Sequence, residues 1–243
     1  AHNNLRSHVI SWLLKPPHFL RKPQQRFLRI LLFHFRINKF RQPFSGQRDL
    51  LEPLKKWGLS ESLPPPPQIF VSTSAEKKVK DLLMALHWES FIALAPSAAY
   101  ALKRWPLEHW KELISLQPEK NFAILGGAED SFLQELTLVD PSRVVHWAGR
   151  LSLQESVAAV SLSRLLISND TGLLHVGEQL GKPTIALMGP APFGFPSRET
   201  TKILELKLSC RPCSKHGQGP CTNEKFHRCL VDISPEQVSL AIL

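Results

Sequence analysis

The alternation of short apolar runs with longer periodic segments after residue 70 constrains the fold of this chain more than any other feature. The apolar runs predict strands at Phe91–Ala95, Phe122–Gly126, Arg143–Trp147, Leu165–Ser168 and Thr184–Met188. The periodic segments predict helices at about Glu76–Leu86, Leu107–Leu116, Asp130–Leu138, Leu153–Ser161 and Leu173–Leu180. This order predicts an α/β fold, a doubly wound parallel sheet with helices on both faces. Ligands of such sheets bind beyond the carboxyl ends of the strands, so functional residues are expected in the loops there.

A proline run separates this alternation from the first quarter of the chain. Residues 63–67 read LPPPP, which ends any helix and favours an extended segment. We therefore expect two units, residues 1–67 and 68–243. All of the excess positive charge lies in the first, because residues 1–60 contain 12 Lys and Arg against only Asp49 and Glu52, whereas residues 61–243 contain 18 against 19 acidic residues. Such asymmetry indicates an anionic partner, either nucleic acid, a phospholipid surface, or a phosphorylated or carboxylated substrate.

Basic and aromatic residues interleave between Arg21 and Arg41, and this pattern predicts a single amphipathic helix. Its cations include Arg21, Arg26, Arg29 and Arg36. A helix of this kind suits contact with an anionic ligand or lipid, and equally suits a half-buried helix whose charges are only solvated. The chain has no apolar stretch long enough to span a membrane, and its opening residues do not read as a signal peptide.

Four strand-end loops contain residues suited to phosphates and sugars. The last, Met188–Pro196, is rich in Gly, Pro and aromatic residues and could line a base or sugar ring, or be ordinary turn chemistry. A loop of small residues, including Ser97, leads to Lys103, whose compact charge can meet a phosphate. Glu129, after two glycines, can accept hydrogen bonds from a ribose, or only favour the start of the next helix. In the third loop Asp170 and Thr171 are good N-caps, and the N–H groups that follow point toward an anion. Each of the first three loops is also compatible with ordinary helix capping.

Two further features of the third loop favour a binding role. Gly172 lies in the first helical turn, where glycine costs about 0.5–1 kcal/mol relative to alanine, which indicates a close approach to the backbone. His175 lies one turn after Thr171 and shares its face of the helix.

The cysteines cluster in the tail of the chain, at Cys210, Cys213, Cys221 and Cys229. Together they could supply the four ligands of a structural zinc ion, although only the first pair has metal-like spacing. The alternative is a set of reduced thiols without a metal.

Taken together, the loops resemble glycosyltransferase family 9, the bacterial heptosyltransferases. The matching segments are IALAPSAAYALKRWPLEHWKEL, AILGGAED, HWAGRLSLQES, LLISNDTGLLHVGEQLGKPTIALMGP and CRPCSKHGQGPCTNEKFHRCLVDISPEQV. They follow the order seen in the family, and the NDTGxxH block is the most specific.

The resemblance implies a GT-B fold with two Rossmann-like halves and an active site in the cleft between them. The C-terminal half, here residues 68–243, would bind ADP-heptose as donor substrate. The N-terminal half, of which residues 1–67 would be a remnant, would bind the lipopolysaccharide acceptor with its Kdo and heptose sugars. Transfer would invert the anomeric centre without a metal ion or other cofactor. The resemblance also implies a cytoplasmic enzyme in peripheral contact with the anionic inner membrane, and no nucleic-acid partner.

The resemblance also assigns roles to individual residues. Lys103 and Asp170 would be the catalytic residues, with Lys103 on the donor phosphates and Ser97 near them. Asp170, Thr171 and Gly172 would contact the diphosphate and heptose, and His175 would support their loop. Glu129 would bind the adenosine ribose, with Gly149 and Leu151 near the adenine. The basic stripe of Arg21, Arg26, Arg29 and Arg36 would face the acceptor or the membrane.

Two departures from the family pattern limit these implications. Members begin with a strand, a glycine-containing loop and an acidic residue proposed as general base, and none of these occurs in this sequence. The expectation is therefore a donor-binding chain with weak or absent turnover. Ser97 also stands where the family usually has glycine, which changes how closely a phosphate can approach. Two alternatives remain, a degenerate nucleotide-sugar-binding protein and a basic nucleic-acid-binding protein.

Overall fold

The computed structural model describes residues 4–20, 25–41, 44–60 and 62–242 of the chain. It divides into two compact units, residues 1–64 and 65–243. The division falls inside the proline run, where the sequence places the boundary after residue 67. Each unit is described by itself.

The first unit is helical in its described parts. Its elements are α1 (Leu5–Leu14), α2 (Arg26–Phe35), α3 (Gly46–Leu51) and the 3₁₀ helix η1 (Glu52–Trp57). Asn4 caps α1 by accepting a hydrogen bond from the N–H of Ser7, and Ser45 caps α3 in the same way. Many apolar side chains of α1 and α2 are exposed, among them Trp12 and Phe27.

The prediction of one helix over Arg21–Arg41 is wrong. Helix α2 begins after Gln25 and ends before Arg36, and both of these residues have left-handed backbone dihedrals. The predicted span contains Pro23, which a helix interior tolerates poorly. Beyond the helix the Asn38 side chain accepts a hydrogen bond from the N–H of Phe40, a local turn that competes with helical bonding.

The basic stripe is only partly a surface feature. Arg26 and Arg36 are exposed, Arg29 is half-buried, and Arg21 lies outside the described residues. No described helix is long and apolar enough to cross a membrane.

The second unit is built on a six-stranded parallel sheet in the order β3-β2-β1-β4-β5-β6. The strands are β1 (Ile92–Ala95), β2 (Phe122–Ile124), β3 (Val144–His146), β4 (Leu165–Asn169), β5 (Thr184–Met188) and β6 (Thr201–Glu205). The predicted α/β fold is confirmed, and five strands lie where the apolar runs predict them. The sequence analysis missed β6, because it is an edge strand in which only Thr201 is buried and the other residues are half-buried or exposed.

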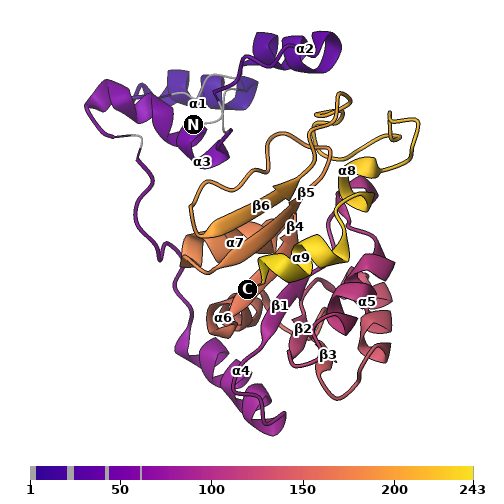
Figure 1. The fold of residues 1–243 in the computed structure, drawn as a ribbon. Helices are drawn as coiled ribbons and strands as arrows, with labels where there is room; N and C mark the ends of the chain where they lie inside the picture. Colours follow the sequence, from indigo (N-terminus) through magenta and orange to yellow (C-terminus); the bar gives the residue numbers. More distant parts are fainter. Residues whose placement is uncertain (1–3, 21–24, 42–43, 61, 243) are drawn as a thin grey trace. The chain divides into compact units, whose positions relative to one another are not determined.

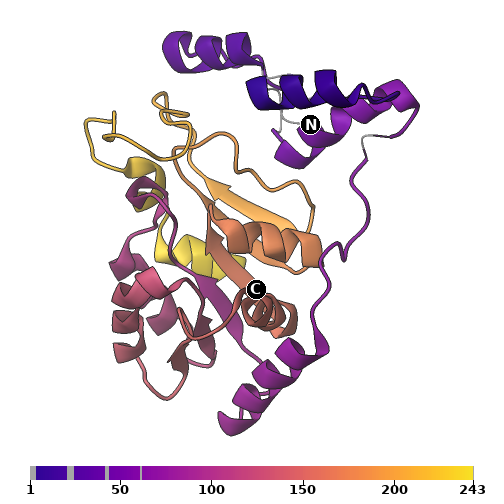
Figure 2. The ribbon, with the colours of Figure 1, turned by 180° about the vertical axis from the view of Figure 1, so that it is seen from behind.

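Helices cover both faces of this sheet (Figures 1 and 2). They are α4 (Thr73–Ala85), η2 (Ala101–Lys103), α5 (Leu107–Ser115), η3 (Ala128–Leu138), α6 (Leu153–Leu162), α7 (Gly172–Leu180), α8 (Arg228–Val231) and α9 (Pro235–Ala241). Serine side chains cap α4, α6 and α9. The segment predicted as a helix over Asp130–Leu138 is a 3₁₀ helix, with a kink at Asp130.

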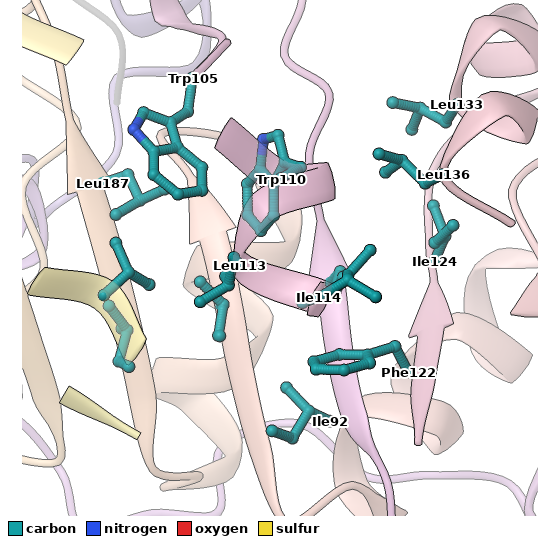
Figure 3. Packing of buried hydrophobic residues seen from close by; sticks show 14 of the residues in the cluster. Ile92, Trp105, Trp110, Leu113, Ile114, Phe122, Ile124, Leu133, Leu136 and Leu187 are labelled. Atoms are coloured by element: carbon teal, nitrogen blue, oxygen red, sulfur yellow. The ribbon is translucent and has the colours of Figure 1, made fainter. Parts of the chain in front are cut away.

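Successive side chains of strand β1 point to opposite faces of the sheet and so contribute to the hydrophobic core on each face. Ile92 and Leu94 pack in the cluster that includes residues of α5, η3 and α9, while Ala93 and Ala95 pack toward α4 and α6. Figure 3 shows Ile92 in this cluster with Trp110 of α5 and Leu133 of η3. Because successive side chains of a strand point to opposite faces, a strand buried on both sides reads as a continuous apolar run. Helices thus cover both faces of the sheet, and a site can form beyond the carboxyl ends of its strands.

Candidate functional site

A lysine and an aspartate meet at the centre of this edge. Lys103 ends η2, in the loop after β1, and Asp170 directly follows β4. These strands are neighbours in the sheet, at the point where the strand order reverses and where open α/β sheets bind ligands. Lys103 Nζ lies 2.7 Å from Asp170 Oδ2, with the two side chains 15% and 6% exposed. The structure thus brings together the two residues that the sequence analysis expects to be catalytic.

A buried asparagine holds the two loops in this arrangement. Asn169 is fully buried at the end of β4, and its side-chain amide donates a hydrogen bond to the Pro96 carbonyl. Its side-chain oxygen accepts a hydrogen bond of 3.1 Å from the Trp105 N–H. The Trp105 indole in turn donates to the Ile233 carbonyl at 2.8 Å. The loop that carries Lys103 is therefore fixed to β4 and to the start of α9.

Two glycines that the sequence analysis did not assign pack against the ion pair. Gly194 lies so close to the Asp170 carboxylate that a Cβ atom there would overlap it. A Cβ atom on Gly217 would lie 2.8 Å from Lys103 Cγ, and this residue has a φ of +84°. Both glycines come from turn-rich segments, and nothing else in the sequence marks them as neighbours of Lys103 and Asp170.

Helix α7 begins beside the ion pair. Thr171 occupies its N-cap position in an extended conformation, and its side chain makes no capping hydrogen bond. Gly172 is exposed, and a Cβ atom built on it would meet nothing within 4 Å. Protein packing therefore does not require glycine here. His175 Nδ1, one turn further on, lies 3.3 Å from the carboxylate of Glu178.

Ser97 lies in the expected loop, but its hydroxyl is engaged within the protein. It donates a hydrogen bond to Asp130, and this carboxylate also accepts the Gly127 N–H at 2.8 Å. Ser97 and Asp130 are both buried. This contact ties the loop after β1 to the loop after β2, a link that the sequence analysis missed because the two residues are far apart in the chain.

The residues expected near the nucleoside lie on the loops after β2 and β3. Glu129 is exposed, with its carboxylate folded over Gly127. Gly149 has a φ of +71°, and a Cβ atom there would come within 2.8 Å of Ala128 Cα, so glycine allows these two loops to touch. Leu151 is half-buried against the apolar core.

The segment that carries the cysteines, residues 210–229, makes hydrogen bonds to the loop after β1. The His227 ring lies 2.8 Å from the Leu102 carbonyl, and Gln218 donates a hydrogen bond to the Tyr100 hydroxyl at 2.9 Å. None of the four cysteines forms a disulfide, and burial raises the pKa of the Cys229 thiol to about 11. In the described part of the chain, no group of three or more His, Cys, Asp or Glu is placed to hold a metal ion. The structure thus gives the zinc hypothesis no support.

A buried histidine at the end of β3 predicts how stability depends on pH. Burial lowers the pKa of His146 below its usual value of about 6.5, so the folded state binds fewer protons than the unfolded state. The stabilisation is complete above pH ~6.5 and is lost as the pH falls below it. In urea titrations at pH 7.5 and 5.5, the wild type should lose more unfolding free energy than His146→Leu. Parallel losses in the two proteins would contradict this assignment.

The order of this parallel sheet is that of a Rossmann-like α/β domain, and polar groups gather at the point where the strand order reverses. The model of glycosyltransferase family 9 (heptosyltransferase) matches residues 2–227. The chain therefore belongs to glycosyltransferase family 9.

Curated relatives carry heptosyltransferase names. The chain is 30% identical over 171 residues to lipooligosaccharide heptosyltransferase 2 of Haemophilus ducreyi, with 66% of this chain and 49% of that protein covered. It is 26% identical over 192 residues to lipopolysaccharide heptosyltransferase 2 of Escherichia coli, covering 74% and 54%. The chain thus spans about half the length of these two relatives.

Solved structures share the fold. The glycosyltransferase family 9 protein of Veillonella parvula superposes with a TM-score of 0.74 at 21% identity, covering 98% of this chain and 70% of that one. ADP-heptose LPS heptosyltransferase II of E. coli gives 0.64 at 21% identity, covering 99% and 73%. The second unit is therefore an α/β domain of the kind found in GT-B heptosyltransferases.

Proposed function

We propose that residues 65–243 bind the nucleotide-sugar donor of a heptosyl transfer. The observation that carries this proposal is the Lys103–Asp170 pair at the β1–β4 junction, beside the start of α7. An ammonium and the first N–H groups of a helix together suit a diphosphate, because both favour negative charge. Lys103 has three N–H donors and uses one for Asp170, which leaves others for phosphate oxygens.

The names of related proteins support ADP-heptose as that donor. E. coli heptosyltransferase WaaC is known in complex with ADP-2-deoxy-2-fluoro heptose, and its structure superposes on 85% of this chain with a TM-score of 0.55. By this proposal Glu129 binds the adenosine ribose, and the loop of Gly149 and Leu151 lies against the adenine. The Asp170 carboxylate accepts hydrogen bonds from sugar hydroxyls, and His175 supports its loop.

The chemistry follows from the charge of the leaving group. As the anomeric carbon becomes cation-like, negative charge grows on the departing diphosphate. Lys103 and the N–H groups of Thr171 and Gly172 then bind the transition state more tightly than the ground state. The acceptor hydroxyl attacks from the opposite face, which inverts the anomeric centre, and it gives its proton to a general base. No metal ion takes part in this proposed mechanism.

The proposed acceptor is the lipopolysaccharide inner core, with its Kdo and heptose sugars. The exposed Arg26 and Arg36 of the first unit would meet the acidic groups of this acceptor or of the membrane surface. By this proposal the protein works in the cytoplasm, in peripheral contact with the anionic inner membrane. Family membership favours this reading of the basic charge over nucleic-acid binding.

Titration calorimetry with ADP, AMP and UDP tests the donor site. We expect saturable binding of ADP, and about 10–100-fold weaker binding of AMP, because the second phosphate makes charge-assisted hydrogen bonds worth about 1.5–3 kcal/mol. UDP keeps the diphosphate and serves as the control for recognition of the base. Equal affinity for ADP and AMP would contradict the diphosphate role of Lys103, and no binding of ADP by the folded chain would overturn the proposed function.

A further inference from the structure

The loop between β5 and β6 reaches the ion pair and is anchored from the far end of α7. The part of this loop from Gly189 to Arg198 is here called the 189–198 segment. It starts where the Gly189 carbonyl accepts a hydrogen bond of 2.8 Å from Arg211 Nε. In its middle Gly194 lies directly against the Asp170 carboxylate. The position of this segment therefore bears on one of the two residues of the candidate donor site.

Glu178 holds the far end of the segment. One oxygen of its carboxylate accepts hydrogen bonds from the N–H groups of two consecutive residues, Ser197 and Arg198, the second at 3.0 Å. The other oxygen lies 3.3 Å from His175 Nδ1. The segment is thus bound to the helix that begins at the donor site, and Phe195 adds a contact with the apolar cluster of Leu174, Ala186 and Met188.

Burying the Glu178 carboxylate at this position costs free energy unless hydrogen bonds compensate for it. Glu178 is fully buried, and an ionised carboxylate loses solvation there. It also lies in the last turn of α7, where the helix dipole disfavours negative charge. Hydrogen bonds from the segment and the contact with His175 offset both costs. An apolar residue would fill the same space without them, but would remove the carboxylate oxygen that accepts both N–H groups.

We propose that Glu178 is a positioning residue for the donor site. It fixes the 189–198 segment so that Gly194 stays against Asp170, which sets the carboxylate and its partner Lys103 for an ADP-sugar. This inference rests on the proposed function. It adds a residue that does not touch the ion pair and that acts on it through the segment, while its second oxygen contacts His175.

Two substitutions at this position separate positioning from stability. Glu178→Gln keeps a side-chain oxygen that can accept both N–H groups, whereas Glu178→Leu has similar volume and no acceptor. We expect Glu178→Leu to weaken ADP binding about tenfold and to speed amide hydrogen exchange at Ser197 and Arg198. Glu178→Gln should stay within about threefold of the wild-type affinity for ADP.

The matched control is Glu155→Leu. Glu155 also accepts a backbone N–H, that of Ser152 at 2.7 Å, but it lies at the start of α6 and holds no part of the 189–198 segment. This variant should lose stability and keep the wild-type affinity for ADP, since a merely structural carboxylate does not set the site. If Glu178→Leu does not fold, Gly194→Ala perturbs the contact with Asp170 from the segment itself, and the same tenfold weakening is expected.

The outcomes distinguish this inference from the proposed function. Wild-type affinity in folded Glu178→Leu, or in Gly194→Ala when Glu178→Leu does not fold, overturns the positioning role while the donor site stands. Equal weakening in Glu178→Gln and Glu178→Leu also overturns it, because hydrogen bonding to the segment would then not matter. Failure of the wild-type chain to bind ADP overturns the proposed function and the positioning role with it. In that case, amide hydrogen exchange at Ser197 and Arg198 still measures whether Glu178 holds the 189–198 segment in place.

Discussion

Replacing Lys103 by methionine is expected to lower the affinity for ADP about 10–100-fold. Methionine keeps an unbranched stem to pack against Gly217, so the change removes the charge and its hydrogen bonds with little loss of packing. A charge-assisted hydrogen bond contributes about 1.5–3 kcal/mol, which corresponds to this range of affinity. Titration calorimetry at constant ionic strength measures the difference directly.

The matched control for this prediction is a lysine outside the site. Lys111 on α5 pairs with Glu108 at 2.8 Å, and Lys111→Met should leave ADP binding unchanged. Lys103→Arg keeps the charge with a different shape, so we expect intermediate affinity. If Lys103→Met binds ADP as the wild type does, the assignment of the diphosphate to the β1–β4 junction is wrong.

Replacing Asn169 by leucine is expected to lower the unfolding free energy by about 2–4 kcal/mol. The side chains have similar volume, but leucine leaves the Pro96 carbonyl and the Trp105 N–H buried without their partner. Each unpaired buried group costs about 1–3 kcal/mol. Urea denaturation followed by circular dichroism should show a lower midpoint, and ADP binding should weaken as well, because the Lys103 loop loses its tie to β4.

The control carries the same substitution at a surface amide. Asn121 donates an exposed hydrogen bond of 3.1 Å to the Ser90 carbonyl, so Asn121→Leu should change the unfolding free energy by at most about 0.5 kcal/mol. A loss for Asn169→Leu no larger than this would show that the buried amide does not hold the two loops together.

The strands were predictable because burial on both faces leaves a local signal. Thr184–Met188 is fully buried and reads as a continuous apolar run, and the predicted strand coincides with β5. The adjacent β6 pairs with β5 along its whole length but lies at the edge of the sheet, so TKILE gives no such run. An edge strand is specified by the partner it pairs with, which a local pattern does not show.

The basic segment Arg21–Arg41 shows the opposite error, because the predicted helix is longer than the observed one. Arginines and phenylalanines continue from Arg21 to Arg41, but the described helix covers only Arg26–Phe35. Composition indicates amphipathic character without fixing where a helix ends. The ends were decided by left-handed backbone at Gln25 and Arg36, which the charge pattern does not encode.

The sequence by itself determined the α/β class, the loops that meet at the candidate site, and the family. These follow from local signals, since apolar periodicity sets strands and helices, and parallel strands bring their carboxyl ends to one edge. Only the tertiary structure decided which of these residues contact one another. It paired Lys103 with Asp170, committed Ser97 to Asp130, and anchored the 189–198 segment on Glu178. Such contacts join residues that are distant in the chain, and they depend on distances that only packing of the whole sheet can fix.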